Sequence, residues 1–287
     1  MKILVFWNIT AFIFLYELLL RIKSLFLYIK ANTDYMKRKI FLTLSMMVSM
    51  VLGVSAQEAY KNVLDITMVS VEGGTFVMGG IEHYGEQCYP DEFPKHTVTV
   101  DDYYIGKYEV TQDLYKFVMG YNPSHFVGDS LPVDNISWVD AKTFIFELNK
   151  MTGKNYRLPT EAEWEFAARG GGLSKGFNYS GSDNVSDVSW CDGNSGRMTH
   201  KVGTKAPNEL GIFDMSGNVY EWCSDRYAIY KSQEQINPQG PEYGKARVMR
   251  GGSWRSESRN CRNTYRSSED YEARILNCGL RLVLDHN

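Results

Sequence analysis

One cysteine lies among four arginines near the C-terminal end of the chain. The stretch GGSWRSESRNCRNTYRSSE, residues 251–269, contains Cys261. Its basic neighbours are Arg255, Arg259, Arg262 and Arg266. Nearby cations stabilise a thiolate and lower the pKa of the thiol. The pattern is typical of a nucleophile or a metal ligand, and it equally suits half of a disulfide or a buried thiol.

The same arginines suggest a second chemistry. A guanidinium group binds a carboxylate or a phosphate through two parallel hydrogen bonds. Arg255, Arg259 and Arg262, with Arg266 beyond them, could therefore line a pocket for an anionic ligand. The alternative is that they pair with carboxylates of the chain itself, and the sequence leaves both open.

Oxygen donors gather in a different motif, SGNVYEW at residues 216–222. Asn218 and Glu221 offer side-chain oxygens, and backbone carbonyls on a turn could add more, which is a donor set that suits Ca²⁺. In the alternative, Asn218 holds a left-handed turn and Glu221 caps or pairs locally. The five histidines have neither HxxxH nor HExxH spacing, so no histidine metal site is predicted.

The number of cysteines shows that they cannot all be paired in disulfides. All five cysteines lie after residue 57, and five is odd, so at least one thiol is left over. The connectivity cannot be deduced. The cysteines are Cys88, Cys191, Cys223, Cys261 and Cys278.

Helical signals are strongest in the middle of the chain. Ser137 to Asp140 forms a capping-box pattern, followed by apolar residues on one face until Gly153. Thr160 to Glu163 forms a second one, and we expect its helix to bury Trp164 and to end at RGGG. A shorter helix is expected at 111–118.

Strand signals flank these helices. Residues 68–80 alternate like a strand, and residues 96–111 carry β-branched and aromatic residues at strand spacing. After residue 170, short aromatic pieces alternate with Gly and Asn turns. The prediction is one α+β domain with much irregular chain over residues 57–287.

The N-terminal part is expected to lie outside that domain. Residues 36–56 have the basic, apolar and small-residue regions of a signal peptide, with cleavage after Ala56. We therefore expect translation to start at Met36, so that residues 1–35 are an upstream mis-start. The alternative is that residues 1–35 contain a membrane helix over residues 3–20. We expect an exported protein, periplasmic or secreted, with a membrane contact only if residues 1–35 are real.

The net charge of the expected domain limits the kinds of partner that it can bind. Residues 57–287 keep 24 of the 31 Lys and Arg and 32 of the 34 Asp and Glu, a net charge of −8. A domain this acidic, without a basic run, is not expected to bind nucleic acid. An exported protein or a small molecule is the expected partner.

Eight motifs in a fixed order carry a family resemblance. They are GGTFVMGG, YYIGKYEVT, NPSHF, LPVDNISWVDA, YRLPTEAEWEFAARGG, PNELGIFDMSGNVYEWCSD, RVMRGGSW and GLRLV. Together they resemble the formylglycine-generating enzyme family, also called the sulfatase-modifying factor domain, from about residue 66 to 285. The resemblance implies a compact, loop-rich α+β fold related to C-type lectins.

The resemblance also implies a site. Family oxidases bind Cu(I) between two cysteines that follow GGS[WY] five residues apart, a choice of soft ligands. The second maps onto Cys261, but the first maps onto Ser256. Ser253 resembles the serine beside the oxygen pocket. The family's structural calcium would use Asn218 and Glu221, and a weaker second site would start at Asn194.

Because Ser256 stands where family oxidases have their first cysteine, three functions remain open. The first is a genuine formylglycine-generating oxidase acting on an exported sulfatase, against which Ser256 argues because a hydroxyl does not replace a thiolate on Cu(I). The second is an oxidase or tailoring enzyme of the same family that uses a different site. The third, which we favour, is a binding or envelope assembly module that has lost the chemistry, with Ca²⁺ expected and Cu(I) not.

Overall fold

The computed structural model describes residues 16–25, 43, 64, 66–80 and 88–286. The chain divides into two compact units, Met1–Asn62 and Val63–Asn287. In the first unit, a helix covers residues 16–25. Of the expected mis-start or membrane segment the structure describes only residues 16–25, and of the expected signal peptide only residue 43. Among the helices that are described, none combines the length and apolar character that crossing a membrane requires.

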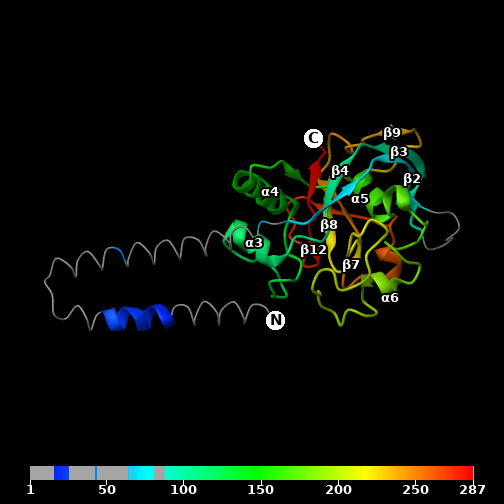
Figure 1. The fold of residues 1–287 in the computed structure, drawn as a ribbon. Coiled ribbons are helices and arrows are strands. Elements are labelled where there is room, and N and C mark those ends of the chain that lie inside the picture. Colours follow the sequence, from blue (N-terminus) through cyan, green and yellow to red (C-terminus); the bar gives the residue numbers. More distant parts are fainter. Residues whose placement is uncertain (1–15, 26–42, 44–63, 65, 81–87, 287) are drawn as a thin grey trace. The chain divides into compact units, whose positions relative to one another are not determined.

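The second unit mixes short sheets with helices (Figure 1). One sheet is ordered β1-β4-β13-β5 and a second β11-β10-β8-β12, with β2-β3-β9 and β6-β7 as smaller sheets. The strands are β1 (Met68–Val71), β2 (Gly74–Met78), β3 (His96–Val100), β4 (Tyr103–Gly106), β5 (Tyr156–Arg157), β6 (Ser189–Trp190), β7 (Ser216–Gly217), β8 (Tyr220–Arg226), β9 (Gln235–Ile236), β10 (Ala246–Arg250), β11 (Arg266–Asp270), β12 (Cys278–Gly279) and β13 (Val283–Asp285). The helices are α3 (Gln112–Met119), α4 (Trp138–Thr152), α5 (Glu161–Ala168) and α6 (Val185–Val188), with 3-10 turns η2 (Pro90–Glu92), η3 (Gly171–Leu173) and η4 (Ser258–Cys261).

The three predicted helices are present. α4 begins after Ser137, whose side chain accepts from the backbone N–H of Asp140, and it ends at Gly153 in a left-handed conformation. α5 begins after Thr160 with the expected capping box, and Trp164 is fully buried. These helices form where predicted because their caps satisfy backbone groups that would otherwise lack partners.

The two predicted long strands each break in two. Residues 68–78 give β1 and β2, which pair with different partners, β4 and β3. The break lies at Gly73, whose backbone N–H donates to Asp102 Oδ1 at 2.7 Å. A Cβ at Gly73 would lie 2.4 Å from the carbonyl oxygen of Val100, so the chains cross too closely for any side chain. Residues 96–106 divide at the same crossing into β3 and β4.

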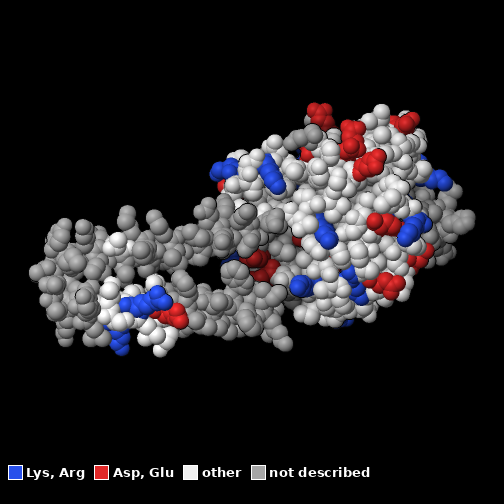
Figure 2. All heavy atoms as spheres, in the orientation of Figure 1, with Lys and Arg blue, Asp and Glu red and all other residues white. Residues whose placement is uncertain are grey.

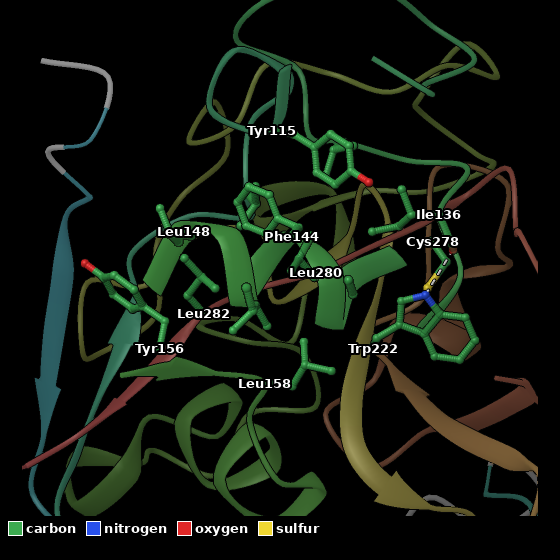
Figure 3. Close-up of a cluster of buried hydrophobic side chains, with 14 of the residues drawn as sticks. Tyr115, Ile136, Phe144, Leu148, Tyr156, Leu158, Trp222, Cys278, Leu280 and Leu282 are labelled. Carbon is green, nitrogen blue, oxygen red and sulfur yellow. Dashed lines mark hydrogen bonds between the residues drawn. The ribbon is translucent and has the colours of Figure 1, made fainter. Parts of the chain in front are cut away.

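The core packs α4 against the segment that joins β12 to β13 (Figure 3). Phe144 and Leu148 of α4 join Leu280 and Leu282 in one buried cluster with Trp222. A second buried cluster surrounds Trp164 of α5 and contains Val248 of β10. Strands β8 and β10 contribute side chains to both clusters, so the sheet β11-β10-β8-β12 is packed on both sides. The candidate site begins at the turn that follows β10.

Candidate functional site

The site begins at a double-glycine turn after β10. Gly251 and Gly252 have φ values of 93° and 75°, which side-chain-bearing residues rarely adopt. A Cβ on Gly252 would lie 2.7 Å from Cys261 Sγ and 2.6 Å from the carbonyl oxygen of Asn260. The glycine therefore allows the turn to lie directly against η4, which carries Cys261.

Ser256 is part of a buried hydroxyl network. Its Oγ accepts a hydrogen bond from the Ser253 backbone N–H at 3.0 Å, and the two Oγ atoms lie 3.0 Å apart. Ser256 Oγ also donates to the Tyr220 hydroxyl at 3.3 Å. Asn277 Nδ2 donates to Ser253 Oγ at 2.6 Å. The network joins the GGSW turn to β8 and to the residue before β12, so both predicted serines have structural partners.

The family's copper arrangement does not fit these residues. Ser256 supplies a neutral hydroxyl that is already hydrogen-bonded, where a soft thiolate is needed for Cu(I). Cys278, a cysteine more distant in the sequence, lies in the apolar cluster of Figure 3. No mechanistic step through copper follows from this arrangement.

Cys261 is instead beside Cys191. The two thiols share a hydrogen bond, which lowers the pKa of Cys191 to about 6. The same bond, together with complete burial, raises the pKa of Cys261. The expectation that arginines lower the pKa of Cys261 is therefore wrong. Sequence reasoning missed Cys191, since the two positions share no motif and lie far apart along the chain.

The arginines have other partners. Arg262 is buried and pairs with Glu92 through both carboxylate oxygens, at 2.6 and 2.8 Å. Glu92 has a lowered pKa, because the bonds from Arg262 and Thr264 outweigh the desolvation that opposes them. Arg266 pairs with Glu161. For these two arginines the alternative of internal pairing holds.

Two arginines remain at the surface. Arg259 is half exposed and lies 2.8 Å from Glu257, with its guanidinium carbon 5.3 Å from the centre of the Tyr89 ring. Arg255 lies over the Trp254 ring at 5.8 Å and is exposed. Of the predicted anion ligands, these two are placed where an outside molecule could reach them.

The predicted calcium ligands are engaged with protein partners. Both oxygens of Glu221 accept from Arg281, and Oε2 also accepts from Trp164 Nε1 at 2.7 Å. Asn218 has a φ of 58°, accepts from the His200 backbone N–H and donates to Glu109 Oε2. As placed, these side chains do not fit a shared Ca²⁺ ion. Calcium binding through them stays a prediction from the sequence.

Asn194 serves a turn. Its Oδ1 accepts from the Cys191 backbone N–H at 2.9 Å, and its Nδ2 donates to the Ser189 carbonyl at 2.9 Å. These bonds close the loop that carries Cys191. Across the described residues, no group of three or more His, Cys, Asp or Glu side chains has a metal-binding arrangement.

Surface charge is mixed on the face drawn in Figure 2. Basic and acidic side chains alternate there, and the second unit presents no extended basic area on that face. That nucleic acid is not a partner stays a prediction from the net charge.

Comparisons with known proteins place the chain in a class. Residues 55–286 match the family described as sulfatase-modifying factor enzyme 1-like domain. A match over this much of the chain defines a loop-rich α+β domain of the formylglycine-generating type. The chain belongs to the sulfatase-modifying factor family, as its motifs indicate.

Individual relatives differ in what their names describe. The chain is 34% identical to "Chaperone protein LppX" of Paenibacillus barcinonensis over 83% of this chain and 96% of that protein. It is 30% identical to the formylglycine-generating enzyme of Mus musculus over 76% of this chain and 75% of that enzyme. Among solved structures, "Treponema denticola variable protein 1" superposes with a TM-score of 0.71 at 30% identity, covering 77% of this chain and 95% of that one.

Proposed function

We propose that this chain is an exported member of the family that acts as a binding or envelope assembly module and does not generate formylglycine with copper. The observation that carries the proposal is the place of Ser256. Its hydroxyl bonds to Ser253 and Tyr220 inside the domain, where family oxidases have their first thiolate.

The argument is one of ligand number and softness. Two thiolates enclose Cu(I), whereas one thiolate and one committed hydroxyl leave the ion loosely held. Because Ser256 is buried with its partners satisfied, recruiting it to a metal would leave other polar groups unpaired. The scaffold around the GGSW turn is kept while the chemistry that depends on the pair is lost.

A binding role is supported by the relatives. A family member named as a chaperone matches this chain over nearly its own full length, and chaperones work by binding other proteins. Export is supported by the order of basic, apolar and small-residue regions in residues 36–56. Arg255 and Arg259 are the exposed cations beside the turn and are the residues that we assign to ligand contact.

One observation favours the alternative of a genuine oxidase. Cys191 lies against Cys261 and could offer the second thiolate that Ser256 lacks. The two candidate functions therefore differ in what the wild-type protein does with Cu(I).

The test uses wild type, Ser256→Cys and Cys191→Ser, each loaded with Cu(I) under reducing conditions and incubated with a cysteine peptide and O₂. We expect no aldehyde from wild type and tighter copper binding in Ser256→Cys than in wild type. Aldehyde from wild type that disappears in Cys191→Ser would overturn the proposal and establish the oxidase.

The binding role needs a direct measurement as well. Arg255→Glu and Arg259→Glu should weaken association with an exported partner identified by cross-linking in the native host, while Lys150→Glu on α4 should not. Equal association by all three variants would remove the assigned surface.

A further inference from the structure

Two cysteines that belong to no shared motif meet in the folded chain. Cys191 follows β6, and Cys261 ends η4. Their exposed fractions are 3% and 0%, and their side chains share a hydrogen bond. A thiol–thiol contact brings two sulfur atoms together in surroundings that exclude most solvent.

A buried serine hydroxyl lies beside the two thiols. The Ser189 hydroxyl is fully buried and interacts with both sulfurs, and at each cysteine its hydrogen bond favours the thiolate. A buried hydroxyl shared by two sulfurs is a second sign that the surroundings stabilise a thiolate here.

The backbone already joins the two segments. The Asp192 backbone N–H donates to the Ser256 carbonyl at 3.0 Å, and Ser195 Oγ donates to the Trp254 carbonyl at 2.6 Å. The loop after Cys191 is thus held against the GGSW turn. A covalent bond between the sulfurs would strengthen a contact that the fold makes without it.

We propose that Cys191 and Cys261 are a reversible dithiol–disulfide pair that fastens the loop at 191–195 to η4 beneath the GGSW turn. The bond forms by exchange with a disulfide oxidant. The Cys191 thiolate attacks one sulfur of the oxidant and forms a mixed disulfide with it, while the other sulfur of the oxidant leaves as a thiol. Cys261 then gives up its proton and attacks Cys191 Sγ, which displaces the first oxidant sulfur as the second thiol. Two cysteine thiols lose two electrons and two protons, and the oxidant disulfide is reduced to two thiols.

Cys191 is the attacking group. At neutral pH its lowered pKa keeps much of it as thiolate, whereas Cys261 holds its proton until the resolving step. Cys191 also stands at the start of a turn in which Asp192 and Gly193 are exposed. We expect the oxidant to reach Cys191 from the side of this exposed turn.

The other two buried thiols, Cys223 and Cys278, have apolar surroundings. Cys223 and Cys278 are fully buried in separate apolar clusters, and burial raises the pKa of both. An apolar environment that opposes the thiolate makes a thiol slow to react. These cysteines therefore serve as internal controls.

The experiment equilibrates the folded protein in oxidised and reduced glutathione mixtures, then alkylates the free thiols and maps the peptides. We expect a Cys191–Cys261 cross-linked peptide, a mass loss of about 2 Da, and full reversal by dithiothreitol. Cross-linking of Cys261 to Cys88, or alkylation of both Cys191 and Cys261 under all mixtures, would overturn the proposal.

Variants separate the pair from a general redox effect. Wild type should melt several degrees higher when oxidised, whereas Cys191→Ser and Cys261→Ser should melt at the same temperature in both states. Cys223→Ala should keep the wild-type shift. A pair that resists oxidation but retains Cu(I) or Zn²⁺ through a desalting column would be a soft-metal site and would equally overturn the disulfide.

Discussion

Glu221 is the residue in which the sequence and the structure suggest opposite roles. The motif SGNVYEW indicates a calcium ligand, but Glu221 is 0% exposed and accepts hydrogen bonds from Arg281 at both carboxylate oxygens. A buried ion pair is costly to break, because the remaining charge is left without a partner. The side chain is therefore more tightly bound to the fold than its motif suggests.

We expect Glu221→Ala to lower the free energy of unfolding by about 3–5 kcal/mol, since Arg281 would be buried and uncompensated. Urea denaturation measures it. The matched control is Glu147→Ala, which removes an exposed pair with Lys150 and should change stability by less than about 1 kcal/mol. A small effect of Glu221→Ala would mean that the ion pair adds little.

Removal of metal decides between the two roles. Because Arg281 and Trp164 already occupy the Glu221 oxygens, the arrangement predicts the same melting temperature in EDTA and in millimolar Ca²⁺. A bound ion would instead add about 2.7 kcal/mol at a hundredfold excess over its Kd. A higher melting temperature in Ca²⁺ that is lost in Asn218→Ala would restore the calcium site.

At the scale of elements, local signals predicted the helices well. Ser137 and Thr160 lie at the starts of α4 and α5, where a side-chain oxygen accepts from the third backbone N–H beyond it. This interaction involves neighbours in sequence, so the pattern is visible without the fold. The C-terminal glycine of α4 is equally local.

The strand breaks and the thiol pair could not be predicted in the same way. Gly73 marks a break because a distant backbone, at Val100, crosses it. Cys191 meets Cys261 because β6 pairs with β7 and the following loop bonds to the GGSW segment. Both facts depend on contacts between remote segments, which single-sequence patterns do not encode. Ser256, by contrast, is identified by the family resemblance, because the position five residues before Cys261 lies within the same motif.

The cap of α5 gives a prediction at this scale. Thr160→Ala should cost about 1 kcal/mol, because the Glu163 backbone N–H loses its acceptor at a buried helix start. Thermal or urea unfolding measures the change. Thr143→Ala, on the exposed face of α4, is the control and should stay within about 0.5 kcal/mol of wild type. Equal effects of the two substitutions would argue against the capping role.

For the whole domain, buried carboxyl groups should set how stability varies with pH. Burial raises the pKa of Asp225 to about 7, and burial also raises the pKa values of Asp134 and Asp214 to about 6 each. Between about pH 4 and pH 7 the folded state then holds protons that the unfolded state has lost. The stability that these groups add is present at low pH and is lost as pH rises through 6 and 7.

The free energy of unfolding should therefore be lower at pH 8 than at pH 5. Asp225→Asn removes the titrating group that has the highest of these pKa values, and it should reduce the loss between the two pH values. Urea unfolding of both proteins at pH 5 and pH 8 measures this. Stability that is equal or greater at pH 8 in wild type would contradict the assignment.

The order of the first sheet has a consequence for how the protein is made. β4 pairs with β1 on one side and with β13, at Val283–Asp285, on the other. During synthesis β1 and β4 emerge early, but β13, which covers the second edge of β4, emerges only after every other strand of the described domain. Until then that edge is open to pairing with another chain. A growing chain, or one truncated before β13, is thus exposed to misassociation until β13 has been made, and completing the sheet requires Val283–Asp285.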